Sequence, residues 1–128
     1  MEPVYIVILV ALLEYIVFTG LVGRARGRYG IKAPATVGHP DFERVYRVQQ
    51  NTLESLIVFV PAIWIFGLYV SAAIGAAFGT AFVVARSVYA VGYIRAAEQR
   101  SIGAMLTAVI NGILVLWALI ALLLRALG

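Results

Sequence analysis

The sequence predicts an all-α integral membrane protein, built as one bundle of four membrane-spanning helices. Of its 128 residues, 63% are hydrophobic and only 12% are charged, whereas charged residues make up roughly 25% of an ordinary soluble domain. The mean hydropathy is +0.99. Four apolar runs are long enough to cross the roughly 30 Å hydrocarbon core of a bilayer. Their short connections favour a single compact domain over residues 1–128.

The connections between the four runs help to place the helices. A first connection rich in glycine, proline and basic residues runs from Arg24 to Pro40, and Asp41 after it is expected to cap the second helix. No basic cluster precedes the first helix, so we expect it to stay as a membrane span rather than to be removed as a signal peptide. The expected helices cover about residues 3–23, 41–68, 72–95 and 102–125.

Most lysines and arginines lie close to the first and third connections, whereas the connection between the second and third helices has none. Because basic residues favour the cytoplasmic side of a membrane, both termini are expected on the non-cytoplasmic side. The same pattern accounts for the net charge of +4, so no nucleic-acid partner is expected. The basic residues near the first connection are Arg24, Arg26, Arg28, Lys32, Arg44 and Arg47, and those near the third are Arg95 and Arg100.

Two stripes of polar side chains lie towards this basic side. With roughly 100° of rotation per residue, each stripe stays within a sector of about 80° on its helix. An arginine inside a membrane span costs roughly 2.5–3.5 kcal/mol on insertion scales, so Arg86 is expected to point inward. The first stripe is Arg44, Arg47, Asn51 and Glu54, and the second is Arg86, Tyr89, Tyr93 and Arg100, provided that the third helix continues past the membrane edge.

The two stripes together offer guanidinium groups, a carboxylate, an amide and two phenols. Such a set suits a small zwitterionic ligand that carries several carboxylates. The chain contains no cysteine, which excludes a thiolate metal site and a protein thiol nucleophile. No metal-ligating cluster, nucleotide-binding loop or catalytic triad is recognisable, so no metal is expected.

The segments FERVYRVQQNTLE, from Phe42 to Glu54, and ARSVYAVGYIRAAEQR, from Ala85 to Arg100, resemble the MAPEG family, membrane-associated proteins in eicosanoid and glutathione metabolism. The resemblance extends over about 36–107 and includes the spacing between the two segments. Within this family, the sequence is similar to the members that act as microsomal glutathione transferases. It implies a homotrimer of four-helix subunits, with glutathione sites at the subunit interfaces that open to the cytoplasmic side.

The resemblance also implies roles for individual residues. Arg100 matches the arginine that stabilises the glutathione thiolate in the catalytic members. Ser55 departs from the pattern, because relatives with tyrosine at this position have one more phenol in the site. Glutathione contacts are implied for Arg47, Gln49, Asn51 and Glu54 on the second helix, for Arg86, Tyr89 and Tyr93 from the adjacent subunit, and for Arg26 in the first connection.

The implied activity is that of a membrane-bound glutathione transferase, with glutathione as co-substrate. A free thiol has a pKa of about 8.5, and a guanidinium beside it can lower that pKa by about 1–3 units. Arg100 in this position would favour the thiolate, which is the nucleophile. The second substrate is expected to be a hydrophobic electrophile or lipid that arrives through the membrane, with reduction of lipid hydroperoxides as a second activity.

Glu14 supports an alternative, because a carboxylate in the middle of a membrane span is a functional-site hypothesis by default. A proton-coupled transporter of the small multidrug-resistance type would use such a glutamate. That class of protein has no use for the two charged stripes, so we expect Glu14 to pair with another helix through Arg86 or Asn111. A non-catalytic, lipid-binding member of the MAPEG family is the other alternative.

Some polar residues have structural explanations. Arg44 is placed to form an ion pair with Asp41 or Glu43. Thr107 and Asn111 are expected to form hydrogen bonds between helices. His39, next to a proline, is expected to be an ordinary loop residue.

Overall fold

Four long helices and one short turn make up the chain. The computed structural model describes residues 1–128, apart from the side chains of Ala97 and Gln99. Each long helix is apolar and long enough to cross a membrane, which confirms the predicted all-α class and the four spans. The elements are α1 (Glu2–Tyr29), α2 (Pro40–Tyr69), α3 (Ala72–Arg95), the 3₁₀ turn η1 (Ala97–Arg100) and α4 (Ser101–Leu127).

The first helix extends farther than the sequence predicted. α1 continues past residue 23 and ends before Gly30, whose φ of 68° is a left-handed conformation that glycine adopts without steric penalty. Gly27 does not end the helix, because one internal glycine costs only about 1 kcal/mol relative to alanine. The predicted connection from Arg24 is therefore wrong for residues 24–29. The basic residues of this segment project from a helix rather than from a loop.

The second helix begins at Pro40 rather than at Asp41. Its N-cap is His39, whose Nδ1 accepts a hydrogen bond of 3.1 Å from the backbone N–H of Asp41. Proline suits the first helical position because it has no N–H to leave unpaired and its φ is already helical. The prediction of Asp41 as the cap is therefore wrong. His39 lies in the connection as predicted, and its side chain caps the helix in addition.

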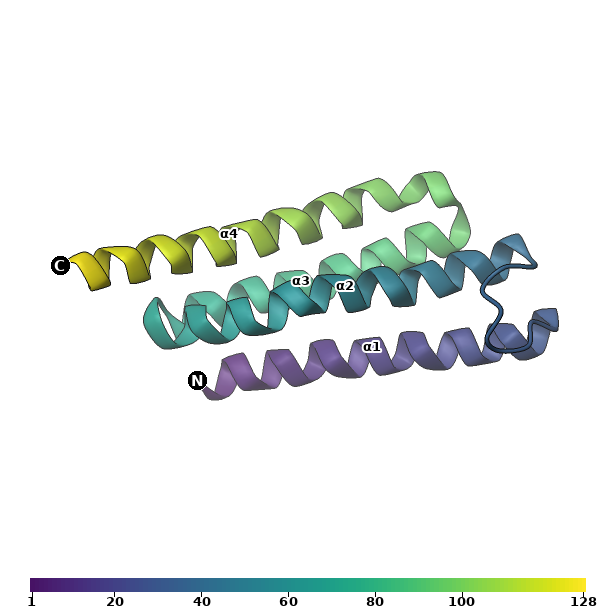
Figure 1. Cartoon of the computed structure of the whole chain (residues 1–128), viewed down its shortest axis with the longest axis horizontal. Coiled ribbons are helices and arrows are strands. Elements are labelled where there is room, and N and C mark those ends of the chain that lie inside the picture. Colours follow the sequence, from purple (N-terminus) through teal and green to yellow (C-terminus); the bar gives the residue numbers. More distant parts are fainter.

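The helices alternate in direction, so both chain termini lie at the same end of the bundle (Figure 1). α2 and α3 form the centre and each contacts all the other helices, whereas α1 and α4 lie on opposite sides of this pair. The opposite end of the bundle carries the α1–α2 connection, the end of α3 and η1. The basic residues of the first and third connections therefore gather at one end.

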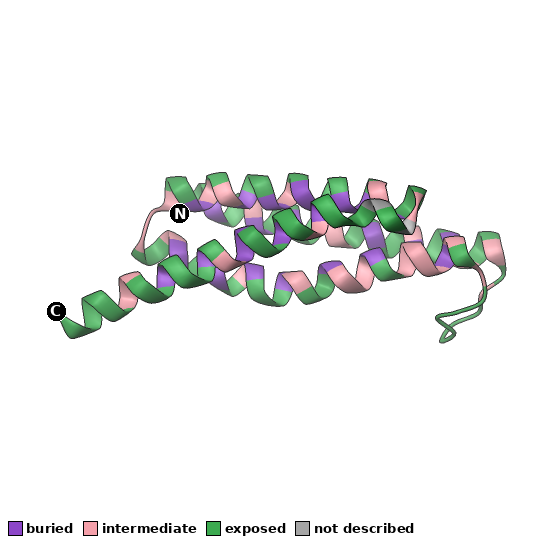
Figure 2. Cartoon of the chain, turned by 90° about the horizontal axis from the view of Figure 1, so that it is seen from above, coloured by how far each residue is buried: buried purple, intermediate pink, exposed green. Residues whose placement is uncertain are grey.

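Apolar side chains fill the interior and also cover the outside. Phe59 of α2 and Phe82 of α3 are fully buried and stack with their ring centroids 3.8 Å apart. Buried residues follow the inner faces of the helices, and exposed residues follow the outer faces (Figure 2). Because many exposed residues of α1 and α4 are leucine, isoleucine or valine, the outer surface suits the hydrocarbon of a bilayer.

A glycine allows α4 to approach α3 closely near η1. A Cβ atom at Gly103 would lie only 2.5 Å from the backbone N and Cα atoms of Tyr89. Because these are backbone atoms, any side chain at position 103 would push the two helices apart. The close approach therefore determines where Tyr89 lies.

Candidate functional site

A small polar pocket lies between α2, the end of α3 and η1. It encloses about 160 Å³. α2 contributes side chains at positions i, i+3, i+4 and i+7, which share one helical face, and α3 contributes two tyrosines one turn apart. The residues that line this α2–α3 pocket are Arg47, Gln50, Asn51, Glu54, Tyr89, Tyr93 and Arg100.

Arg44 of the first predicted stripe pairs with Asp41 and lies outside the α2–α3 pocket. The other three residues of that stripe and three residues of the second, Tyr89, Tyr93 and Arg100, meet in this pocket. They do so within one chain, whereas the resemblance implied that the α3 residues would act from an adjacent subunit. The reason is that α2 and α3 are neighbours that run in opposite directions, so the first half of α2 lies beside the last turns of α3. Residues of α2 and α3 thus line one pocket within a single chain, and the contribution of an adjacent subunit stays a prediction.

Arg100 reaches the pocket by a different route from the predicted one. α3 does not continue to this residue, because Ala96 adopts an extended conformation with φ −160° and ψ 133°. The turn η1 then brings Arg100 back over the end of α3. Its guanidinium carbon lies 5.6 Å from the ring centroid of Tyr93, within the range of a cation–π interaction.

Arg86 lies beneath the pocket and does not line it. The side chain is 0% exposed, which confirms that it points inward. Its Nη2 donates to the hydroxyl of Thr52 at 2.8 Å, and its Nη1 donates to the hydroxyl of Thr107 at 3.4 Å. The guanidinium carbon lies 4.1 Å from the ring centroid of Tyr89. Arg86 thus supports a tyrosine of the pocket, and Thr107 forms the predicted contact between helices.

Gln49 lies outside the pocket, and its neighbour Gln50 is part of it. Gln49 donates from Nε2 to the hydroxyl of Thr19 in α1 at 3.0 Å, on the other side of α2. Helical rotation could have indicated that Gln50, and not Gln49, lines the pocket. Gln50 lies about 40° from Glu54 around the helix, whereas Gln49 lies about 140° away. The resemblance suggested Gln49, and the helical rotation favours Gln50.

Arg26 also lies outside the pocket. Its Nη1 donates to the backbone carbonyl of Ala35 at 2.7 Å and approaches that of Ile31 at 3.5 Å. The guanidinium carbon lies 5.1 Å from the ring centroid of Phe42. These contacts fasten the α1–α2 connection to the start of α2.

Glu14 pairs with a different partner from those predicted. Its carboxylate accepts a hydrogen bond of 2.7 Å from the hydroxyl of Ser87 in α3, and neither Arg86 nor Asn111 bonds to it. Adjacent helical residues point about 100° apart, so Ser87 faces α1 while Arg86 faces the core. Asn111 instead donates to the carbonyl of Ser55 at 3.3 Å, which confirms the predicted hydrogen bond between helices.

Residues 4–120 of the sequence match the sequence profile of the MAPEG family. The chain belongs to the MAPEG family. It is 46% identical over 113 residues to an uncharacterized protein of Synechocystis sp., an alignment that covers 88% of this chain and 82% of that protein. Microsomal glutathione S-transferase 2 of Mus musculus is 41% identical over 106 residues, covering 83% of this chain and 70% of the relative. Leukotriene C4 synthase of Mus musculus is 34% identical over 115 residues, covering 90% of this chain and 73% of that relative.

Membership of the MAPEG family confirms the resemblance seen in the two sequence segments. Together with the four apolar helices, it identifies the chain as an integral, multi-pass membrane protein. It gives no support to the transporter that Glu14 had suggested. Among the residues that the structure describes, no group of three or more metal-ligating side chains could hold an ion.

Proposed function

We propose that this MAPEG protein is a membrane-bound glutathione transferase, which joins the glutathione sulfur to hydrophobic electrophiles. The observation that carries the proposal is the α2–α3 pocket, where two arginines, a glutamate, two amides and two phenols line one space. A relative named microsomal glutathione S-transferase 2 supports this assignment.

The groups in the pocket match those of glutathione, which carries two carboxylates, an ammonium group and two amides. We assign Arg47 to a carboxylate, Glu54 to the ammonium group and Asn51 to a peptide amide. Hydrogen bonds to charged groups contribute roughly 1.5–3 kcal/mol each. The tyrosine hydroxyls of α3 would complete the hydrogen bonding of the ligand.

Arg100 is the proposed catalytic residue. A guanidinium group does not act as a proton acceptor in proteins, so Arg100 would stabilise the thiolate without taking the proton itself. Water or another base accepts the thiol proton, the thiolate sulfur bonds to the electrophilic carbon, and the leaving group or opened ring takes the electron pair. Tyr93, below the guanidinium, would hold Arg100 at the mouth of the pocket.

The second substrate is proposed to be a hydrophobic electrophile or a lipid, with lipid hydroperoxide reduction as a second activity. Such molecules concentrate in the bilayer because apolar surface is removed from water there. An enzyme with an apolar outer surface and a polar pocket at one end of its bundle can bind the hydrophobic substrate from the bilayer and glutathione from water.

The size of the pocket supports a homotrimer with sites between subunits. Its volume of about 160 Å³ is below the roughly 300–1,000 Å³ of sites that enclose a drug-sized ligand. Gln49 and Arg26 face away from the pocket of their own chain. If they contact glutathione as the resemblance implies, they do so from a neighbouring subunit. Light scattering of the detergent-solubilised protein should give the mass of a trimer, and a monomer would contradict this part of the proposal.

Replacement of Arg100 tests the proposed chemistry. Loss of one electrostatic contact to a developing anion typically lowers kcat by about 10²–10³-fold. We expect Arg100→Ala to do so for conjugation of a hydrophobic electrophile, and to remove the ultraviolet absorbance of the bound thiolate. Arg100→Lys should restore part of both signals. Arg125→Ala, at the other end of the bundle, serves as the control and should conjugate normally.

Undiminished conjugation per bound glutathione in Arg100→Ala would refute the role of Arg100. A wild-type protein that binds lipid but conjugates and reduces nothing would favour the non-catalytic, lipid-binding alternative.

A further inference from the structure

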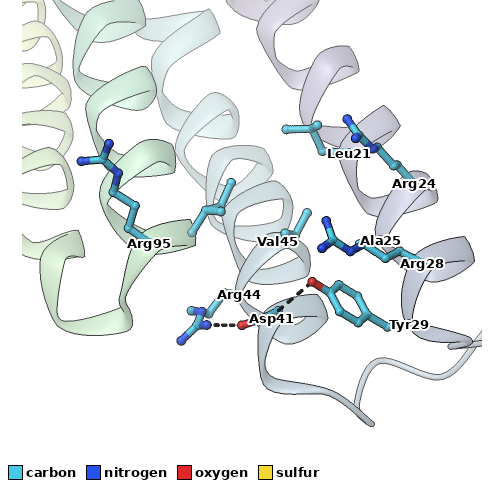
Figure 3. A pocket seen from close by; sticks show the side chains of 10 residues that line it. Leu21, Arg24, Ala25, Arg28, Tyr29, Asp41, Arg44, Val45 and Arg95 are labelled. Atoms are coloured by element: carbon cyan, nitrogen blue, oxygen red, sulfur yellow. Dashed lines mark hydrogen bonds and ion pairs between the residues drawn. The ribbon is translucent and has the colours of Figure 1, made fainter.

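A second polar cavity lies at the same end of the bundle and shares no residue with the α2–α3 pocket. It encloses about 500 Å³ between the end of α1, the first turns of α2 and the end of α3. Figure 3 shows Arg28 and Tyr29 extending from α1 towards α2. The polar residues of this interhelical cavity are Arg24, Arg28, Tyr29, Asp41, Arg44 and Arg95.

The interhelical cavity has an excess of positive charge. Four arginines from three helices line it together with one aspartate, which leaves three positive charges unbalanced. Within the described part of the chain, Arg24, Arg28 and Arg95 have no carboxylate at salt-bridge distance. Like charges held close together repel one another, so an anion in the cavity would relieve this repulsion.

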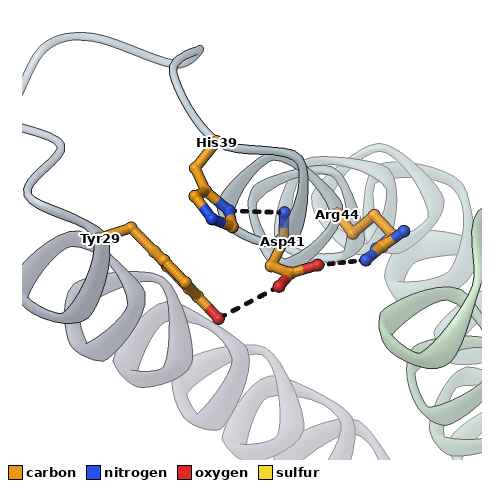
Figure 4. Close-up of polar contacts among 4 residues, drawn as sticks. All are labelled: Tyr29, His39, Asp41 and Arg44. Atoms are coloured by element: carbon orange, nitrogen blue, oxygen red, sulfur yellow. Dashed lines mark hydrogen bonds and ion pairs between the residues drawn. The ribbon is translucent and has the colours of Figure 1, made fainter.

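The single aspartate of the cavity is already engaged. Asp41 forms the predicted ion pair with Arg44, and it accepts a hydrogen bond of 3.4 Å from the hydroxyl of Tyr29 (Figure 4). The ring of His39 stacks on that of Tyr29 with the centroids 4.1 Å apart. These contacts hold one wall of the cavity in place. The Nε of Arg44 nevertheless remains buried without a partner.

The cavity lies where the apolar spans give way to basic ends. Leu21, Val45 and Ile94 line it beside the arginines. Leu21 lies three residues before Arg24, where the basic end of α1 begins. Ile94 directly precedes Arg95, the last residue of α3. A basic pocket between transmembrane helices at the membrane surface is a typical site for an anionic lipid headgroup.

We propose that the interhelical cavity binds a phosphate group, supplied by the headgroup of an anionic phospholipid. Guanidinium groups suit phosphate because their forked N–H donors match its oxygens. The volume of about 500 Å³ leaves room for a glycerophosphate headgroup rather than for an inorganic ion alone. A soluble organic phosphate has the same recognition chemistry and is the other source to be tested. The proposal does not depend on glutathione transfer.

The test is a titration of the full-length protein in neutral detergent, followed by native mass spectrometry. The probes are short-chain phosphatidylglycerol, short-chain phosphatidylcholine, glycerol 3-phosphate and inorganic phosphate. Phosphatidylglycerol should bind once per chain, and phosphatidylcholine much more weakly. Because each basic residue near an anionic lipid contributes about 1 kcal/mol, Arg24→Gln and Arg28→Gln should each weaken binding about fivefold.

Two variants provide matched controls. Lys32→Gln removes one positive charge from the α1–α2 connection at the same end, outside the cavity. Arg125→Gln removes one from the end that carries the termini. Both should bind phosphatidylglycerol as the wild type does. If the lipid is attracted only by the general positive charge at this end, Lys32→Gln will weaken binding as much as Arg28→Gln, and the proposal is wrong.

The soluble probes identify the source of the phosphate. Stronger binding of phosphatidylglycerol than of glycerol 3-phosphate supports the lipid, whereas equal binding shows a phosphate site for soluble ligands and overturns the lipid as its source. Equal binding of phosphatidylcholine and phosphatidylglycerol overturns the site altogether. Should a variant fail to fold, phenylglyoxal modification of the wild type remains. Phosphatidylglycerol should then protect Arg24 and Arg28 but not Arg125, and uniform modification would again contradict the proposal.

Discussion

Arg86 is the largest of the fully buried side chains that the structure describes, and it lies in a membrane span. Its hydrogen-bond partners are the neutral hydroxyls of Thr52 and Thr107. The Nε of Arg86 is buried without a hydrogen-bond partner, so the two hydroxyls are the groups that stabilise its charge. Removal of either one would leave the buried charge with still less solvation. The two threonines are therefore as important to the site as the arginine, although neither lines the pocket.

We predict that Thr52→Val destabilises the protein. The substitution keeps the shape of the side chain but removes the acceptor at 2.8 Å from Arg86. Hydrogen bonds to charged groups contribute about 1.5–3 kcal/mol, so thermal unfolding in detergent should show a loss of that size. Glutathione affinity should fall as well, because Arg86 would shift beneath Tyr89.

Thr80→Val is the control for this variant. Thr80 is exposed and its hydroxyl donates to the carbonyl of Ala76 within α3 at 2.9 Å. Its replacement should change stability little, since β-branched valine fits the same rotamer of the helix. Equal losses in the two variants would mean that the contact of Thr52 with Arg86 contributes nothing specific.

Among the helices, the contact between α3 and α4 controls the shape of the pocket. Tyr89 and Tyr93 lie on α3, and η1 between these helices carries Arg100. The spacing of the two helices therefore sets the distance between the tyrosines and the arginine. Gly103 makes that spacing as small as the backbone allows.

We predict that Gly103→Ala lowers both stability and glutathione affinity. The new Cβ would meet the backbone of Tyr89 at 2.5 Å, so α3 and α4 must separate. Overpacking of this kind costs about 1–3 kcal/mol. Gly112→Ala in the same helix has no atom within 4 Å of its Cβ, and its better helix propensity should stabilise the protein by up to about 1 kcal/mol. Unfolding and glutathione titration of both variants check this, and similar behaviour of the two would contradict it.

The ends of the elements show where local sequence was insufficient. α3 has the predicted bounds, since a serine cap begins it and the chain turns after Arg95. α1 was predicted to end at the first basic residues, but charged residues are good helix formers outside the membrane. Gly30 could have indicated the true end, because glycine adopts the left-handed conformation that closes a helix.

In the whole molecule, the alternating helices place most of the basic residues at one end and both termini at the other (Figure 1). The α2–α3 pocket and the interhelical cavity both lie at the basic end. The positive-inside rule predicts that this end faces the cytoplasm, and we propose that glutathione is taken up there. This orientation is part of the proposed function.

The absence of cysteine makes the orientation testable with single-cysteine variants. Lys32 in the α1–α2 connection and Leu127 near the C-terminus are both exposed. In intact cells, a membrane-impermeant maleimide should label Leu127→Cys at once and Lys32→Cys only after permeabilisation. The opposite order of labelling would place the pocket on the outer side and contradict the proposed orientation.

The sequence by itself determined the class of protein and the local arrangement of its polar residues. Composition is sufficient for the first, because a chain so apolar can bury its surface only in a bilayer. Helical periodicity is sufficient for the second, since it places Arg47, Asn51 and Glu54 on one face of α2 and aligns Tyr89 with Tyr93 on α3. These are properties of residues close together along the chain.

Only the tertiary structure decided which faces meet. The rotation of each helix about its axis depends on contacts with distant segments, which local periodicity does not contain. It brought three residues of each stripe into one pocket of one chain and turned Gln49 towards α1. The turn η1, which brings Arg100 to Tyr93, likewise depends on how α4 packs against α3 at Gly103.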